Sequence, residues 1–391
     1  MKQGQEKKFQ PGNVLTISIS HLVHDIYSSF LAPILPLLIA KFELSLFWAG
    51  SLSVIGRLPS LLNPIVGILA DKLSVRYFII IAPSITAVTM SLLGVAPGYG
   101  GLAILCFIMG VSATLFHVPG PVMIKQVAGD RVGKGMSFYM LGGELARTLG
   151  PMVILGAVSL WGLEGSYRLI PFGIMASLAL YYRVRNIKIC DDFKKNEPSP
   201  QAGLKETINR YLLFFIMLVG IIFSRALMKA VLTTFLPTYL HLVKGESLWI
   251  SGISLSILQS AGALGTFFCG SISDKIGRKT TLLIISAASP VLVLIFLLVK
   301  GLYIIPLLVL SGFSIIGSTP VLLALVQDLN SDRPAFMNSI FMTISFFLTA
   351  VATMMVGFLG DHIGLESTFW LSAFLGFGSL PFILKLKSGK E

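Results

Sequence analysis

The sequence predicts an all-α membrane protein with twelve transmembrane helices, arranged as two six-helix halves related by pseudo-symmetry. The first observation is composition: 54% of the residues are hydrophobic and 12% are charged, whereas a soluble globular protein carries about 25% charged residues. The second is a repeated motif, GILADKLSVR at 67–76 and GSISDKIGRK at 270–279, each time between two apolar runs. Duplicated sets of membrane helices are typical of secondary transporters.

The chain contains twelve apolar runs, each close to the ~20 residues that a helix needs to cross the hydrocarbon core of a bilayer. Backbone N–H and C=O groups in lipid must be paired within their own segment, so we expect every run to be a helix. The expected spans are 13–40, 46–70, 77–95, 101–124, 134–160, 166–183, 211–241, 248–270, 280–299, 302–327, 335–360 and 367–386.

A polar stretch divides these spans into two sets of six. It contains DDFKKNEPSPQAG, whose charges, Pro, Ser and Gly are typical of a solvated linker. We therefore expect an N-terminal bundle at 1–183, a cytoplasmic linker at 184–210 and a C-terminal bundle at 211–391.

The positive charge of the chain follows the pattern of a membrane protein. The formal net charge is +12, and with both termini inside, most Lys and Arg fall in the inner loops, the linker and the two ends. This is the positive-inside distribution. It predicts a multi-pass protein of the inner (plasma) membrane with cytoplasmic termini, and it argues against a nucleic-acid partner.

No cofactor, metal ion or enzyme activity is expected. The three cysteines have neither disulfide nor metal-ligand spacing, and the sequence has no P-loop and no credible nucleophile triad. Without a motif for ATP, an ion gradient is the remaining source of energy.

Charged side chains inside the spans are the leading candidates for function. A charge at the bilayer centre costs about 2.5–3.5 kcal/mol on insertion scales, so such a residue marks a protected or functional place. The first expected helix carries His21, His24 and Asp25 on one side, because 3.6 residues make a turn. The other candidates are Arg57, Glu144, Arg147, Arg225 and Lys229.

Helical spacing groups several of these charges. Arg225 and Lys229 lie at i, i+4, where like charges repel, which favours a role in substrate binding or in a proton path. Glu144 and Arg147 lie at i, i+3 and could equally be a structural pair. Cations outnumber carboxylates in the spans, which favours an anionic substrate, because a guanidinium binds carboxylate, phosphate or phosphonate bidentately.

Three further polar residues have two interpretations each. His117 lies beside two prolines and either contributes to a site or supports a kink. Arg57 precedes Pro59 and either binds substrate or bonds backbone carbonyls that the proline frees. Gln259 either joins two helices or contacts substrate. The predicted substrate-binding set is Arg225, Lys229, Arg147, Arg57, His117 and Gln259.

Asp25 is the expected proton carrier, with Glu144, His24 and His21 as further proton-coupling residues. Alignment of Leu35-Pro36 with Leu236-Pro237 places His24 opposite Arg225 in the second half. The hypothesis is that a bound anion draws Arg225 away and favours protonated Asp25, and that release of the anion reverses this change.

The repeated motif resembles the loop signatures of the major facilitator superfamily, and the resemblance extends over essentially the whole chain. In that family the loop Asp, here Asp71, caps a neighbouring helix and latches the outward-open state. The first copy departs from the pattern, with Ser74 where a Gly is expected. The resemblance implies a conformational role for Gly67, Asp71, Arg76, Gly270, Asp274, Gly277 and Arg278.

Other stretches resemble the exporters of this family. MLGGELARTLGPMV at 140–153 is similar to their Gly-Pro motif, here Gly150 and Pro151, although close packing of small residues is the alternative reading. The Arg of a second exporter signature is replaced by Cys106. SHLVHDIYSSFLAPILPLL at 20–38 and LFHVPGPVMIKQVAG at 115–129 resemble the fosmidomycin-resistance branch.

Together these features predict a monomeric, proton-coupled antiporter that exports a small anionic compound or drug, phosphonate-like or an organic acid. The same charges would serve an importer of an organic anion. A receptor or lipid-handling protein on this fold is the alternative of another class, and the charged spans and the second motif favour transport over it.

Overall fold

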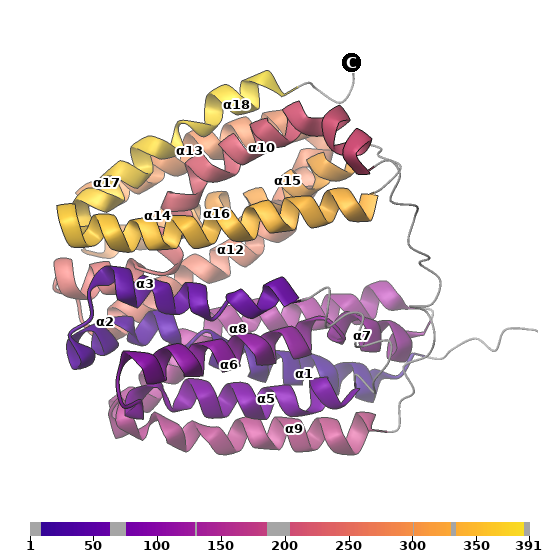
Figure 1. Cartoon of the computed structure of the whole chain (residues 1–391), viewed down its shortest axis with the longest axis vertical. Coiled ribbons are helices and arrows are strands. Elements are labelled where there is room, and N and C mark those ends of the chain that lie inside the picture. Colours follow the sequence, from indigo (N-terminus) through magenta and orange to yellow (C-terminus); the bar gives the residue numbers. More distant parts are fainter. Residues whose placement is uncertain are drawn as a thin grey trace, which may run out of the picture. The chain divides into compact units, whose positions relative to one another are not determined.

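The computed structural model describes residues 9–62, 76–129, 131–185, 204–299, 301–329 and 334–386, and every regular element in these ranges is helical (Figure 1). The chain divides into two compact units. The first comprises 1–43 and 52–197, and the second comprises 44–51 and 198–391. The expected linker at 184–210 falls largely on residues outside the described ranges.

The first unit is a bundle in which α1 packs against α8, α5 and α9, and α5 packs against α6. These helices lie side by side in Figure 1. The helices of this unit are α1 (Pro11–Ser28), α2 (Leu31–Phe42), α5 (Arg76–Ser91), α6 (Tyr99–His117), α7 (Gly120–Ala128), α8 (Val132–Trp161) and α9 (Ile170–Val184). The helix α3 (Leu46–Ile55) contributes its first residues to the second unit and its last to the first.

In the second unit α12 packs against α14, and α10 packs against α16, α17 and α18. The helices of this unit are α10 (Leu204–Thr233), α11 (Leu236–Thr238), α12 (Leu248–Ile276), α13 (Arg278–Leu298), α14 (Ile304–Ile316), α15 (Ser318–Gln327), α16 (Pro334–Ile363), α17 (Leu365–Gly376) and α18 (Ser379–Lys385).

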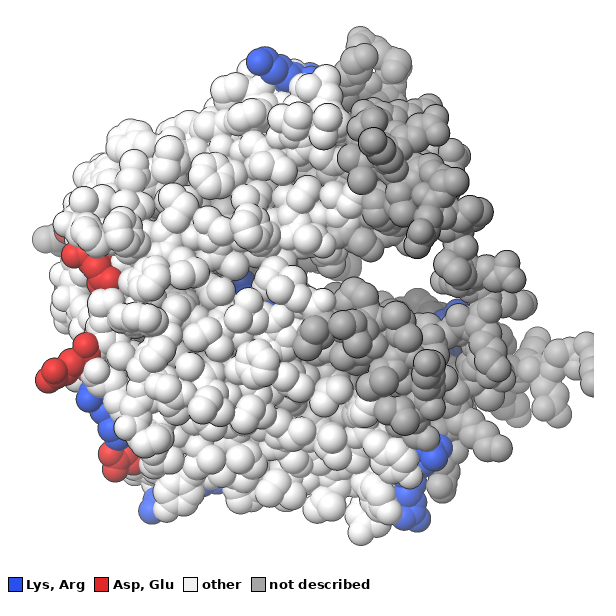
Figure 2. Space-filling view, viewed as in Figure 1, with Lys and Arg blue, Asp and Glu red and all other residues white. Residues whose placement is uncertain are grey.

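Nine helical segments among the described residues are long and apolar enough to cross a membrane. The other three expected spans appear as shorter helices: α5 has 16 residues, α9 has 15, and α3 has 10 and precedes the undescribed residues 63–75. On the face in view in Figure 2, almost all of the described surface is uncharged, and charged side chains gather toward the helix ends. This distribution is the one that a lipid environment requires.

The first helix of each unit is interrupted ahead of a proline. Proline has no N–H and its ring clashes with the carbonyl four residues earlier. The residue four before Pro33 is Ser29, directly after the end of α1, and the residue four before Pro237 is Thr233, the last residue of α10. The same rule therefore ends both helices.

The N-terminus of α3 is held by a carboxylate of the second unit. The first N–H groups of a helix have no partner within it, and negative charge is favoured there. Asp361 Oδ1 accepts from Leu46 N at 2.6 Å, and Asp361 Oδ2 accepts from Phe47 N at 2.9 Å. Both orphan donors are thus satisfied by one side chain.

Glycines allow the helices of each bundle to approach closely. A Cβ on Gly312 of α14 would lie 2.2 Å from the Leu258 carbonyl oxygen of α12, and one on Gly110 of α6 would lie 2.1 Å from the Gly56 oxygen. Both neighbours are backbone atoms, which cannot move without shifting a helix. By contrast, nothing lies within 4 Å of a Cβ on Gly156 in α8.

Gly312→Ala is expected to destabilise the protein by about 1–3 kcal/mol, because the added methyl overpacks the contact between α12 and α14. Gly156→Ala is the matched control, and it is expected to be neutral or stabilising by up to about 1 kcal/mol, since alanine favours helix. The measurement is the apparent unfolding temperature of each purified variant in detergent. Equal shifts for the two variants would contradict the close packing at Gly312.

Candidate functional site

The carboxylate of Asp25 is surrounded by three imidazoles of the first unit. Its Oδ2 lies 3.2 Å from His21 Nε2, and its Oδ1 lies 2.9 Å from His24 Nδ1 and 3.2 Å from His117 Nε2. One turn of α1 supplies His21, His24 and Asp25, while His117 ends α6. We call these four residues the Asp25 cluster.

A hydrogen-bond chain fixes the ring of His24. The Ser112 hydroxyl donates to the Ala82 carbonyl at 2.8 Å, so it accepts from the Thr86 hydroxyl, also at 2.8 Å. Thr86 has then used its proton and accepts from His24 Nε2–H at 3.0 Å. The other ring nitrogen of His24 faces Asp25 Oδ1, and a hydrogen bond there requires one further proton, held by either residue.

His21 is held by α8. Its Nδ1 donates to the Tyr139 carbonyl at 2.7 Å, and its ring stacks on that of Tyr139 with centroids 4.0 Å apart. The same helix leaves room for it, because a Cβ on Gly143 would lie 2.8 Å from His21 Cε1. His21 Nε2, the nitrogen that faces Asp25, has no hydrogen-bond partner in the described structure.

The Asp25 cluster is accessible from one side. The side chains of His21, His24 and Asp25 are 5%, 0% and 10% exposed, whereas that of His117 is 42% exposed. His117 is therefore the member of the cluster that an approaching ion reaches first.

The other charged candidates of the first unit lie on α8 and beyond α3. Arg147 Nη2 contacts Glu144 Oε1, one turn away on the same helix. Arg57 is exposed and follows the end of α3.

On α8, Gly142 and Gly150 approach α1, since their Cβ atoms would lie 2.5 Å from the Ser18 oxygen and 2.6 Å from Ser29 Cβ. In this structure Gly150, beside Pro151, therefore allows α8 to pack closely against α1.

Arg225 is buried in the second unit among neutral groups. Its Nη1 donates to Ser286 Oγ at 2.8 Å, and its Nη2 donates to the Ser314 carbonyl at 3.2 Å. No carboxylate pairs with it among the residues that the structure describes. A buried guanidinium without a counter-charge is costly, and it remains protonated.

A cavity of about 70 Å³ lies beside this guanidinium. Half-buried Lys229 lines it one turn along α10, together with hydroxyl groups of α15 and α16. Gln259, half-buried on α12, is not among the lining residues. The polar residues that line this cavity are Arg225, Lys229, Ser318, Thr319, Ser345 and Thr349.

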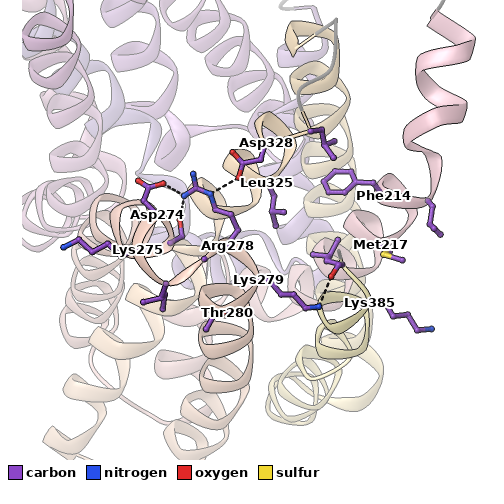
Figure 3. A pocket seen from close by; sticks show the side chains of 16 residues that line it. Phe214, Met217, Asp274, Lys275, Arg278, Lys279, Thr280, Leu325, Asp328 and Lys385 are labelled. Carbon is purple, nitrogen blue, oxygen red and sulfur yellow. Dashed lines mark hydrogen bonds and ion pairs between the residues drawn. The ribbon is translucent and has the colours of Figure 1, made fainter. Parts of the chain in front are cut away.

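The second copy of the repeated motif forms an ion-pair network at the junction of α12 and α13 (Figure 3). Arg278 pairs with Asp274, and its Nε donates to Asp328 Oδ2 at 3.1 Å. Gly277, with φ of 93°, makes the turn between the helices, and Gly270 lies in the last turns of α12. The network borders a cavity of about 670 Å³.

Most of the first copy lies outside the described residues. Gly67 and Asp71 fall in 63–75, so the expected latch at Asp71 stays a prediction. Arg76 begins α5, and its guanidinium lies 5.1 Å from the centre of the Tyr77 ring.

Sequence reasoning did not group His117 with Asp25, because the two are far apart in the chain. It also found no metal spacing, yet one ligand atom each of His21, Asp25 and His117 lie within 4.8 Å of one another. The only local signal was His21 and Asp25 at i, i+4 on one helix face.

Comparison with known proteins defines the class of the protein. The sequence matches the family described as Major Facilitator Superfamily over residues 17–353. The chain therefore belongs to this superfamily of secondary transporters, and it is a multi-pass membrane protein and not an enzyme.

Individual relatives are distant. The chain is 25% identical to the fosmidomycin resistance protein of Escherichia coli over 92% of this chain and 89% of that one. It is 25% identical to the multi-drug resistance efflux pump PmrA of Streptococcus pneumoniae over 68% of both. Solved structures share the fold: a bacterial homologue of the lysosomal transporter Spinster has a TM-score of 0.79 at 14% identity, covering 95% of both chains. A D-xylose–proton symporter has a TM-score of 0.74 at 16% identity, covering 98% of this chain and 99% of that one.

Thr86→Val is expected to destabilise the protein by about 1–3 kcal/mol, because it leaves buried His24 Nε2–H without an acceptor. Thr89→Val, one turn along α5, is the control. The Thr89 hydroxyl donates only to carbonyls of its own helix, so its loss should cost less than about 1 kcal/mol. Unfolding temperatures in detergent test this, and equal losses would contradict the proposed direction of the hydrogen-bond chain.

Proposed function

We propose that this protein is a proton-coupled antiporter that exports a small anionic compound, phosphonate-like or an organic acid, across the inner (plasma) membrane. In this proposal it acts as a monomer with both termini in the cytoplasm. The observation that carries the proposal is Arg225, a buried cation in the second unit whose described partners are all neutral.

An anion at the cavity beside Arg225 would supply the missing counter-charge. The guanidinium has five N–H groups, and two of its nitrogens donate to Ser286 and Ser314, which leaves further N–H groups for a ligand. Lys229 and the hydroxyl groups of Thr319 and Ser345 add donors of the kind that an oxyanion accepts from. The hydroxyl groups of Ser318 and Thr349 already donate to backbone carbonyls. Arg147, Arg57, His117 and Gln259 remain further candidates for contact with the substrate.

Protons would be exchanged in the Asp25 cluster. The hydrogen bond between His24 and Asp25 needs a proton in addition to the one on His24 Nε2, whose N–H donates to Thr86, so the cluster already has a place for a mobile proton. His21 and Glu144 are further candidates for this exchange. Antiport requires that proton loading at Asp25 and anion binding at Arg225 exclude each other, so the proposed cycle replaces the hypothesis that a bound anion favours protonated Asp25.

The relatives support export as the direction. Two of the relatives that match the sequence are named for fosmidomycin resistance and for multi-drug efflux. Resistance of this kind is consistent with removal of a compound from the cell.

The direct experiment uses everted membrane vesicles with a respiration-generated pH gradient, followed by dye fluorescence. Small phosphonates, organic phosphates and carboxylates are added one at a time. Collapse of the gradient with an anion, absent from vesicles that lack the protein, is expected. No collapse with any of them would overturn the proposal in favour of import, or of a lipid-handling role.

Asp25→Asn is expected to abolish the anion-driven collapse, since the amide cannot carry the proton. Glu164→Gln is the control, because Glu164 pairs with Lys41 outside the spans and should leave the signal unchanged. Retention of full activity in Asp25→Asn would remove Asp25 from the mechanism.

Arg225→Gln is expected to weaken anion binding roughly 10–100-fold, because hydrogen bonds to a charged group contribute about 1.5–3 kcal/mol. Arg225→Lys, which keeps the charge, should retain part of the affinity. The measurement is the anion concentration for half-maximal collapse, and unfolding temperature shows whether each variant is folded. Unchanged affinity in a folded Arg225→Gln protein would place the anion elsewhere.

A further inference from the structure

We infer that His21, Asp25 and His117 form a binding site for one divalent transition-metal ion of the zinc type. The inference rests on the geometry of these side chains and is independent of the proposed substrate and direction of transport. The sequence predicted no metal site, because the ligands come from two helices and share no motif.

The distances within the site are close to those that a metal requires. With bonds of about 2.0–2.2 Å, two ligand atoms of a tetrahedral zinc site lie roughly 3.3 Å apart. Asp25 Oδ2 lies 3.2 Å from His21 Nε2, and the other carboxylate oxygen, Oδ1, lies 3.2 Å from His117 Nε2. One ligand atom from each of the three residues lies within 4.8 Å of the other two, so the side chains have to draw together by up to about 1.5 Å to reach the separation in a zinc site.

His21 is already arranged as a metal ligand. A ligating histidine almost always donates its other ring N–H to a carboxylate or carbonyl, which fixes the tautomer and aims the lone pair at the metal. His21 Nδ1 donates to the Tyr139 carbonyl at 2.7 Å. Its Nε2 is buried, lacks a hydrogen-bond partner and faces Asp25. In the neutral ring, Nδ1 carries the proton, so the lone pair is on Nε2 and is directed into the site.

The ligand set indicates which ion would bind. Two imidazoles and one carboxylate suit Zn²⁺ and Co²⁺, whereas Ca²⁺ and Mg²⁺ require mainly oxygen ligands. His117 is 42% exposed on its side chain, so the site has an entrance and a place for a water molecule as fourth ligand. A bound metal ion would occupy atoms that hold protons in the proposed function, and this consequence alone depends on that function.

The test is a Co²⁺ titration of the full-length protein, purified without a histidine tag and treated with a chelator. We expect one equivalent to bind with the visible absorption bands of Co²⁺–imidazole coordination, and Zn²⁺ to displace it. His21→Gln and His117→Gln should each weaken binding at least tenfold. Because His117 lies at the accessible side, its substitution is the less disruptive of the two, and unfolding temperatures confirm folding.

His241→Gln and His362→Gln are matched controls. Each of these rings also bonds a backbone carbonyl through Nδ1, at 2.8 Å, but neither belongs to a group of ligands among the described residues. Both should bind Co²⁺ as the unmodified protein does. Absence of the absorption bands, or unchanged affinity in folded His117→Gln and His21→Gln, would overturn the metal site. A failure of anion-driven proton movement in vesicles would leave this result untouched.

Discussion

The buried carboxylate of Asp25 is the interaction on which the arrangement of the first unit depends. A carboxylate inside a membrane bundle is costly unless polar groups surround it. Here α1 and α6 supply imidazoles, α5 supplies the hydroxyl that orients His24, and α8 supplies the carbonyl that orients His21. Four helices are thus fixed relative to one polar centre, and the glycines of α8 allow the close approach that this centre requires.

In the second unit a buried cation, rather than a buried carboxylate, is stabilised by neutral groups. Arg225 is solvated by a serine hydroxyl and a backbone carbonyl, neither of which cancels its charge. A repeated motif indicates that the two halves share an origin, yet one half concentrates imidazoles around an acid and the other isolates a guanidinium. This division of chemistry is what an exchange of protons for an anion would use.

Sequence periodicity predicted the helices and the in-membrane charges, because a lipid environment constrains both strongly. It could pair Glu144 with Arg147, which are neighbours on one helix, and the two side chains are in contact. It could not bring His117 to Asp25 or supply Ser286 and Ser314 to Arg225, because these contacts depend on how separate helices pack. Hydroxyl groups give no sequence signal in spans where Ser and Thr are common.

The burial of Arg225 has a consequence for biosynthesis. Both described partners of its guanidinium, on α13 and α14, are translated after α10. When α10 first enters the bilayer, the cost of about 2.5–3.5 kcal/mol for such a charge must be offset by its own apolar residues, and an 18-residue window within 211–233 has a mean hydropathy of 2.2. The hydrogen bonds of Arg225 can form only after α13 and α14 have been translated. The final packing of α10 is therefore a late, cooperative step in the assembly of this half.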